Sequence, residues 1–317
     1  MTPPAFWQRD GAVSRLFSPV AALAGAWTAR RMTRPGWRAP VPVLCCGNAG
    51  VGGAGKTTVA FDLASRLRAR GVAVHCLTRG YGGRVKDVLL VDPAQHDAAL
   101  VGDEPLLLAC VAPTWVGADR AQSARAAVAA GAQALVLDDG LQNPGLAKTA
   151  SLLVVDGAVG FGNGRVMPAG PLREEVAAAA KRCRACVMIG PDVRAAAALV
   201  GPLPILEATL LPDRTLEGAR VFAFCGIARP SKFLDTLQEA GAELAGSAAF
   251  PDHHPFTAGE IERVLARAAT LGARPITTAK DAVRLAPSWR TRIEVLGVRL
   301  RWRDEPALER LLDEVMG

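Results

Sequence analysis

The sequence predicts an α/β fold in which a mostly parallel sheet carries helices on both faces. From Val41 onwards, short apolar runs rich in β-branched residues alternate with Ala-rich helical stretches, and this alternation is typical of parallel sheets. The 317 residues are enough for two domains of ordinary size. Half of the residues are hydrophobic but only 5% are aromatic, so we expect closely packed, Ala-rich cores.

The first 38 residues differ from the rest of the chain and predict a membrane-associating helix. With Ser18 as N-cap and Pro19 at the first helical position, this helix is expected to run to about Met32. Its continuous apolar stretch, 20–27, is far shorter than the ~20 residues that span a bilayer. Aromatic residues before it and arginines after it favour a helix that lies in the membrane interface. A signal peptide and a helix that only packs on the protein are the alternatives.

Strands and helices alternate between residues 39 and 200. The expected helices run from Lys56 to Arg70 and from Ala121 to Ala130, and a glycine closes each of them. The expected strands lie at 41–48, 72–77, 87–92, 114–117, 134–140, 151–156 and 185–190.

A proline-rich break follows, and we place a domain boundary near Gly201. The predicted domains are therefore the N-terminal helix at 1–38, a core domain at 39–200 and a smaller α/β domain at 201–317. In the last domain we expect strands at 220–226, 275–278 and 293–302, and helices at 230–240, at 257–271 and at the C-terminus.

A glycine-rich loop follows the first expected strand. Gly50, Gly55, Lys56 and Thr57 fit the pattern G-x-x-x-x-G-K-[ST] between a strand and a helix, which is the context that a phosphate-binding loop requires. Its backbone N–H groups wrap phosphates, Lys56 reaches the terminal phosphates and the Thr57 hydroxyl binds Mg²⁺. The fold is therefore expected to be of the P-loop NTPase type. The residues expected to bind ATP are Gly50, Val51, Gly52, Gly53, Ala54, Gly55, Lys56, Thr57 and Thr58.

The apolar strand at 134–140 ends in Asp138 and Asp139. A carboxylate at a strand end opposite the phosphate loop is expected to complete the Mg²⁺ site. A simple cap of the turn before Gly140 is the alternative.

Four further stretches carry polar side chains in positions of interest. "LTRGYGG" places Arg79 on a turn after a strand, and "VGDEP" places Asp103 and Glu104 where a helix begins. "FGNGRVMPAGPLRE" is longer than a connector requires, and "FPDHHPF" contains two of the four histidines. Each alone has an ordinary explanation: helix starts favour acidic residues, and paired histidines are more often solvated or packed than catalytic.

Taken together and in this order, the stretches resemble the tetraacyldisaccharide 4'-kinase family, the lipid A kinases of Gram-negative bacteria, over essentially the whole chain. The matching stretches are "GNAGVGGAGKT", "TRGYGG", "GDEP", "DDGLQ", "GNGRVMPAGPLRE", "FCGIARPSKF", "PDHHPF" and "KDAVRL". The chain departs from the family pattern at Thr58, Asn143 and Ala279.

The resemblance implies ATP- and Mg²⁺-dependent phosphorylation of the 4'-hydroxyl of a tetraacylated disaccharide 1-phosphate. We expect Asp103 to accept the hydroxyl proton with help from His253. Nearby carboxylates such as Glu104 are expected to raise the pKa of Asp103. Lys56 and Arg79 are the other expected catalytic residues, and Thr57, Asp138, Asp139 and Glu104 the expected metal ligands. Asn163, Arg165, Arg173 and His254 are expected to contact the substrate.

The net charge of +7 favours anionic partners. The expected partners are the acylated substrate and the cytoplasmic face of the inner membrane, to which the protein binds as a peripheral or monotopic protein. We expect no nucleic-acid partner, because the arginines do not interleave with an aromatic platform, and no obligate protein partner is evident. The seven cysteines are an odd number scattered through expected strands, which favours reduced thiols in the cytosol over a disulfide framework.

A regulatory P-loop GTPase or a metallochaperone-type NTPase is the alternative function. Guanine recognition usually needs [NT]-K-x-D, whereas "TAKD" at 278–281 places Lys280 directly before Asp281. The spacing therefore argues against a GTPase.

Overall fold

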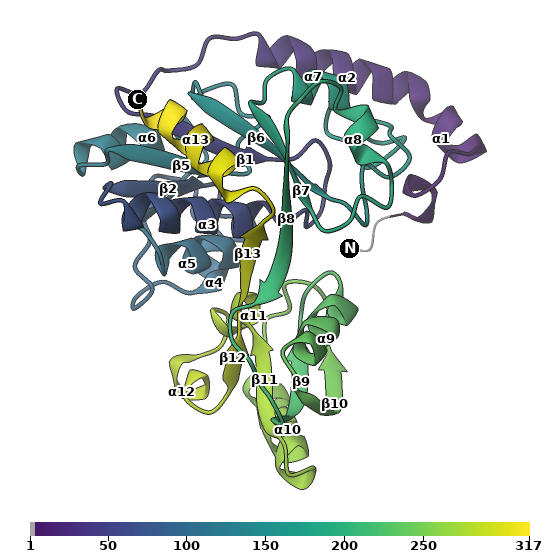
Figure 1. Cartoon of the computed structure of the whole chain (residues 1–317), viewed down its shortest axis with the longest axis vertical. Coiled ribbons are helices and arrows are strands. Elements are labelled where there is room, and N and C mark those ends of the chain that lie inside the picture. The colour runs from purple at the N-terminus through teal and green to yellow at the C-terminus, as the bar shows by residue number, and fades with distance from the viewer. Residues whose placement is uncertain (1–3) are drawn as a thin grey trace.

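A nine-stranded sheet forms the centre of the larger domain in the computed structural model, which describes residues 4–317 (Figure 1). Its inner strands pair in parallel, and only the edge strands β3 and β13 run antiparallel to their neighbours. The mostly parallel sheet that the sequence predicts is thus confirmed. In spatial order the strands are β13 (Val298–Trp302), β8 (Ile205–Pro212), β7 (Ala185–Ile189), β6 (Ala150–Asp156), β1 (Val43–Gly47), β5 (Ala134–Asp138), β2 (Val74–Thr78), β4 (Thr114–Val116) and β3 (Leu89–Leu90).

Helices cover both faces of this sheet because its inner strands are apolar on both sides. Leu44 and Cys46 of β1 face one core and Val43 and Cys45 face the other, and all four are buried. The first core is covered by α3 (Lys56–Ala69), α5 (Asp103–Ala109) and α13 (Glu305–Met316). The opposite face is covered by α6 (Arg120–Ala129), α7 (Val176–Ala180) and α8 (Ala196–Leu199).

The N-terminal segment contains η1 (Ala5–Trp7), α1 (Ala12–Leu16) and α2 (Ser18–Met32). Helix α2 ends at Met32, as expected, but its N-cap is Phe17 rather than Ser18. The Ser18 hydroxyl instead donates to the carbonyl of Ser14. Figure 1 shows α2 along the larger domain, at the end remote from the smaller one.

The smaller domain has a four-stranded parallel sheet in the order β10 (Glu243–Ala249), β9 (Arg220–Cys225), β11 (Arg274–Thr278) and β12 (Glu294–Leu296). Helices α9 (Pro230–Glu239) and α10 (Ala258–Thr270) pack on its opposite faces. Two short helices, α11 (Ala279–Ala282) and α12 (Pro287–Arg290), follow β11.

The chain leaves the large sheet after β8, and not at the boundary expected near Gly201. Strand β8 lies beyond Gly201 but belongs to the large sheet, and β13 returns to the same sheet near the C-terminus. The expected strand 293–302 is therefore two strands in two sheets. The two crossings lie side by side, since the backbone N–H of Asp213 donates to the carbonyl of Gly297 over 3.1 Å.

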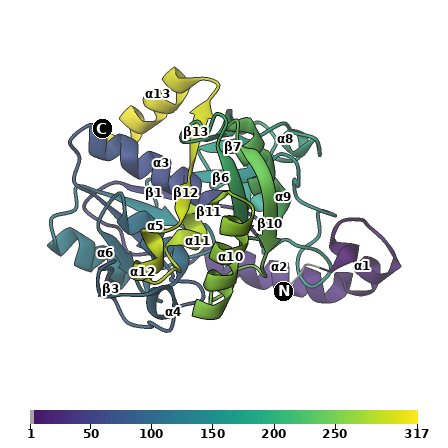
Figure 2. The same cartoon turned by 90° about the horizontal axis from the view of Figure 1, so that it is seen from below.

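The carboxyl edge of the large sheet faces the smaller domain (Figure 1). Asp156 ends β6 and pairs with Arg229 and Lys232 at the start of α9. The short helix α4 (Ala98–Val101) leads into α5, whose start meets α11 of the smaller domain (Figure 2). Ligands of open α/β sheets bind at this edge.

Candidate active site

The phosphate-binding loop, residues 48–55, joins β1 to α3 at the carboxyl edge of the large sheet. Gly52 and Gly55 have positive φ values of 108° and 87°, a backbone conformation that favours glycine. A Cβ on Gly55 would also lie 2.6 Å from Cδ1 of Ile189. The loop therefore needs glycine at position 55 for its turn, and a side chain there would also displace the end of Ile189.

Thr57 and Asp138 lie together, as expected for a metal site. The Thr57 hydroxyl donates to Oδ2 of Asp138 over 2.9 Å, while the buried Oδ1 of Asp138 has no hydrogen-bond partner among residues 4–317. Burial raises the pKa of Asp138 to about 6. A buried carboxylate oxygen left free beside a hydroxyl is a donor set that suits Mg²⁺.

Asp139 connects the phosphate loop to the long loop at 161–174. Its backbone has a positive φ of 51°, and its carboxylate accepts two bonds from Arg173, of 2.8 and 3.1 Å. The ammonium of Lys56 lies 3.8 Å from the same carboxylate. Burial alone would raise the pKa of Asp139, but the charges of Lys56 and Arg173 outweigh it and the pKa is lowered. Arg173, an expected substrate contact, is thus part of the carboxylate network.

The 161–174 loop also supports the phosphate loop and the N-terminal segment. The N–H of Val51 donates to the carbonyl of Pro171 over 2.8 Å. The amide nitrogen of Asn163 donates to the carbonyl of Phe6 and to the Ser14 hydroxyl. Arg165 pairs with Asp10 through two bonds and donates to the Ser18 hydroxyl. Both side chains, expected at the substrate, bind the N-terminal segment.

Asp103 and His253 come from different domains and form a close pair. Asp103 begins α5 and is 3% exposed, and its Oδ2 lies 2.9 Å from Nδ1 of His253 in the loop before α10. His253 has a positive φ of 59°, which few residues other than glycine adopt, and its backbone N–H donates to the carbonyl of Gly226. The smaller domain thus holds the ring against the carboxylate.

The pKa of Asp103 is shifted in the direction opposite to the one expected from the sequence. Burial alone would raise it, but the hydrogen bonds from His253 and Glu104 and the charge of Lys280 hold it well below its usual range. Glu104 is the group with the raised pKa, about 7, because it is partly buried and lies beside Asp103. The hydrogen bond to Asp103 raises the pKa of His253. Burial and the charge of Lys280 would lower this pKa, but the hydrogen bond outweighs them.

Glu104 lies with this pair and not with the Thr57–Asp138 group. Its Oε1 is 3.2 Å from the ammonium of Lys280. Ligand atoms of Asp103, Glu104 and His253 lie within 4.8 Å of one another, but Lys280 already supplies a positive charge to both carboxylates. The four expected metal ligands therefore fall into two clusters.

Two cations next to Asp103 are site residues that the sequence pattern did not predict. The ammonium of Lys280 lies 3.7 Å from Oδ2 of Asp103, and Nε of Arg284 lies 3.6 Å from the same oxygen. Burial lowers the pKa of Lys280, but the two carboxylates outweigh this effect and the pKa is raised. Both residues belong to the stretch "KDAVRL", whose charge spacing on one helical turn was the available signal.

The remaining expected residues have separate environments. His254 stacks on Phe250 with ring centroids 5.0 Å apart, and its Nε2 lies 3.0 Å from Glu260 of α10. Arg79 is exposed directly after β2. The neighbouring Tyr81 is 71% exposed, and its ring centroid lies 6.0 Å from that of His253. Tyr81 is thus available to a ligand at the Asp103–His253 pair.

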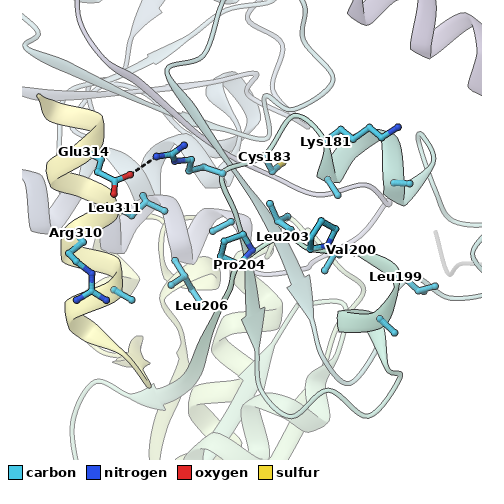
Figure 3. Close-up of a pocket in the computed structure, with 18 residues that line it drawn as sticks. Lys181, Cys183, Leu199, Val200, Leu203, Pro204, Leu206, Arg310, Leu311 and Glu314 are labelled. Carbon is cyan, nitrogen blue, oxygen red and sulfur yellow. Dashed lines mark hydrogen bonds and ion pairs between the residues drawn. The ribbon is translucent and has the colours of Figure 1, made fainter.

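A cavity of about 750 Å³ lies elsewhere, between α7, α8 and α13 (Figure 3). Its lining is mostly apolar, and the lining residues include no expected site residue. Cavity size therefore does not identify the candidate site in this fold.

Comparisons with known proteins identify the family of the chain. A model of the family described as tetraacyldisaccharide-1-P 4'-kinase matches residues 13–317. The tetraacyldisaccharide 4'-kinase of Gluconacetobacter diazotrophicus is 56% identical, with 99% of this chain and 98% of that protein covered. The protein of the same name from Rhodospirillum centenum is 53% identical, with 98% and 96% covered.

A solved structure shares the fold. The crystal structure of LpxK from Aquifex aeolicus in complex with ATP superimposes with a TM-score of 0.78 at 23% identity, covering 96% of this chain and 100% of that one. On the strength of the family match and the close relatives, the chain belongs to the tetraacyldisaccharide 4'-kinase family.

Proposed function

We propose that this protein transfers the γ-phosphoryl group of ATP to the 4'-hydroxyl of a tetraacylated disaccharide 1-phosphate, with Asp103 and His253 at the acceptor hydroxyl. The enzyme class follows from the family: the chain is a tetraacyldisaccharide 4'-kinase of lipid A biosynthesis. The family membership favours the kinase over a regulatory GTPase. The single observation that supports the residue roles is the 2.9 Å contact between Asp103 and His253 at the sheet edge that carries the phosphate loop.

The phosphate loop and Lys56 bind the triphosphate in this proposal. Backbone N–H groups of residues 50–57 surround the phosphates at the N-terminus of α3, and the Lys56 ammonium neutralises charge on the terminal groups. Thr57, Asp138 and Asp139 would hold Mg²⁺, whose charge stabilises the phosphoryl oxygens during transfer. The free Oδ1 of Asp138 is the observation that supports this assignment.

Asp103 accepts a hydrogen bond from the acceptor hydroxyl and finally takes its proton. Its low pKa makes it a weak base but keeps it ionised at neutral pH, so that it always accepts. The loose transition state of phosphoryl transfer needs an oriented hydroxyl more than a strong base. His253 orients the carboxylate. Because the ring belongs to the smaller domain, the catalytic pair forms only where the two domains meet.

The N-terminal helices would place the protein on the cytoplasmic face of the inner membrane. Their exposed apolar side chains include Leu16, Leu23 and Trp27, which are 76%, 73% and 61% exposed. Arg30 and Arg31 end α2, where they can meet anionic headgroups. None of the helices in residues 4–317 is long and apolar enough to cross a membrane. A peripheral or monotopic association is therefore proposed, with the acylated substrate drawn from the same surface.

The test is a direct assay of purified protein with ATP, Mg²⁺ and the tetraacylated disaccharide 1-phosphate. Mass spectrometry should show a product that is heavier by one phosphoryl group. Asp103→Asn, which keeps the size of the side chain, should form this product far more slowly. Hydrolysis of ATP without a phosphorylated lipid would overturn the proposal.

A further inference from the structure

Lys280 lies where it contacts every member of the proposed acceptor site. Its ammonium is 3.4 Å from Nε2 of His253, 3.7 Å from Oδ2 of Asp103 and 3.2 Å from Oε1 of Glu104. Lys280 lies in the single turn of α11. Both α11 and His253 belong to the smaller domain. The Asp103–His253 pair therefore has a third member, which touches the far side of the imidazole ring.

The two neighbours of the ring select the same protonation pattern. An ionised carboxylate only accepts, so Nδ1 of His253 must carry the proton that faces Asp103. An ammonium only donates, so Nε2 must present its lone pair to Lys280. The resulting chain of donors runs in one direction, from Lys280 to His253 to Asp103.

A competing acceptor makes the lysine necessary. Oδ2 of Asp252 lies 3.7 Å from the same Nε2, and a carboxylate there favours a proton on Nε2. The groups that face the ring are thus Asp103, Asp252, Lys280 and the edge of Tyr81. Without Lys280, Asp252 and Asp103 together would favour an imidazolium or a turned ring.

We propose that Lys280 is a positioning residue of phosphoryl transfer, whose donation to Nε2 keeps His253 neutral and holds its Nδ1 proton on Asp103. This inference deepens the proposed function and rests on it. Lys280 acts through the imidazole and does not itself accept the hydroxyl proton. Its substitution should therefore lower kcat more than it changes KM for either substrate.

The chain offers a matched control. Lys232 is a second lysine of the smaller domain, and its ammonium forms an ion pair with Asp156 of the larger domain over 3.4 Å. Arg229 pairs with the same carboxylate, so Lys232→Met removes one interdomain ion pair without touching the ring. A general effect of interdomain charge would appear in both lysine variants.

The experiment uses full-length protein labelled with ¹⁵N-histidine, and ring nitrogens are observed by long-range ¹H–¹⁵N correlation at pH 8. The chain has four histidines, and His253→Gln assigns the signals. In the unsubstituted protein, Nδ1 of His253 should be protonated and Nε2 unprotonated. Lys280→Met should add a proton to Nε2 and lower kcat roughly tenfold, a part of the ~10²–10⁴ that acid–base catalysis contributes. Lys280→Arg should retain the native signals and most of kcat, and Lys232→Met should match the unsubstituted protein.

Two outcomes would overturn the inference: unchanged ring signals in Lys280→Met, or equal losses of kcat in Lys280→Met and Lys232→Met. Lys280→Gln is measured alongside, because a neutral polar side chain is better tolerated against two carboxylates than methionine, and the same changes are expected. Failure of the proposed function is a different result. If His253→Gln keeps full kcat, the pair itself has no catalytic role, whereas a slow His253→Gln with an unaffected Lys280→Met refutes only the role of Lys280.

Discussion

Oδ2 of Asp103 and Nδ1 of His253 lie 2.9 Å apart although the residues are 150 positions apart in the chain. Asp103 belongs to the larger domain, and His253 to the smaller one. The contact makes the relative position of the two domains a condition for the site to exist.

We predict that Asp103 and His253 act as a unit. Asp103→Ala and His253→Ala should each lower kcat by ~10²-fold or more with a much smaller change in KM, because each removes orientation of the acceptor hydroxyl. The double variant should lose little more than the worse single variant. Steady-state kinetics of all three variants test this. Multiplicative losses would mean that the two residues act independently.

Lys56→Ala should lower turnover by orders of magnitude, since the ammonium neutralises charge that develops on the transferring phosphoryl group. In the structure Lys56 also lies 3.8 Å from Asp139 and donates to the carbonyl of Gly52. The fold should remain intact, as circular dichroism can establish. Near-normal turnover in a folded variant would refute the assignment of this lysine.

The sequence predicted the parts of the site that local patterns encode. The phosphate loop with Thr57, and Asp138 at a strand end, depend on neighbours in the chain, and the structure brings them together. The Asp103–His253 pair came from the family resemblance, because no local pattern joins residues so far apart. Lys280 was missed as a site residue because the charge spacing of "KDAVRL" does not show which distant carboxylates the side chain meets.

The prediction of a single strand at 293–302 was wrong because one local sequence pattern is compatible with either one strand or two. The stretch 293–302 reads as one strand because apolar residues recur along it, but this pattern does not fix the sheet to which each part belongs. The backbone N–H of Asp213 donates to the carbonyl of Gly297, so a contact between residues distant in the chain joins the two crossings between the sheets. Asn163 and Arg165 lie in a glycine-rich loop typical of ligand binding, yet loop polar groups also bond to neighbouring segments.

The membrane prediction is best tested with point substitutions. Deleting residues 1–38 would also remove Asp10 and Ser18, which bind Arg165 of the 161–174 loop. Leu23→Ser combined with Trp27→Ser removes only exposed apolar side chains. Binding to vesicles with anionic lipid should weaken, and it should weaken with salt in the unsubstituted protein, because each arginine near the surface contributes ~1 kcal/mol. Unchanged sedimentation of the double variant with vesicles would place the membrane contact elsewhere.

The last prediction concerns the decrease in the free energy of unfolding that the buried carboxylate of the proposed metal site causes. Asp138 is buried, and its pKa is raised from 3.8 to about 6. A raised pKa means that the folded protein binds the proton more tightly, so this stabilising effect is complete below pH 3.8 and is lost as the pH rises through about 6. Asp138→Asn removes the cost of the buried charge. At pH 8 in EDTA it should raise the free energy of unfolding by up to about 3 kcal/mol while abolishing turnover.

Asp139→Asn is the matched control, because it is expected to lower the free energy of unfolding where Asp138→Asn raises it. Its pKa is lowered because Lys56 and Arg173 outweigh burial, so the ionised carboxylate stabilises the fold above its unfolded pKa and loses this effect only at more acidic pH. This substitution should therefore destabilise the protein by a similar amount at pH 8 and at pH 5. For Asp138→Asn the gain should shrink by roughly 1 kcal/mol between pH 8 and pH 5. Urea unfolding of both variants at the two pH values measures these differences. If Asp138→Asn gave the same gain at both pH values, packing and not charge would explain the effect of this residue on the free energy of unfolding. The interpretation of Asp138 as a carboxylate that destabilises the fold in order to bind the metal would then be wrong.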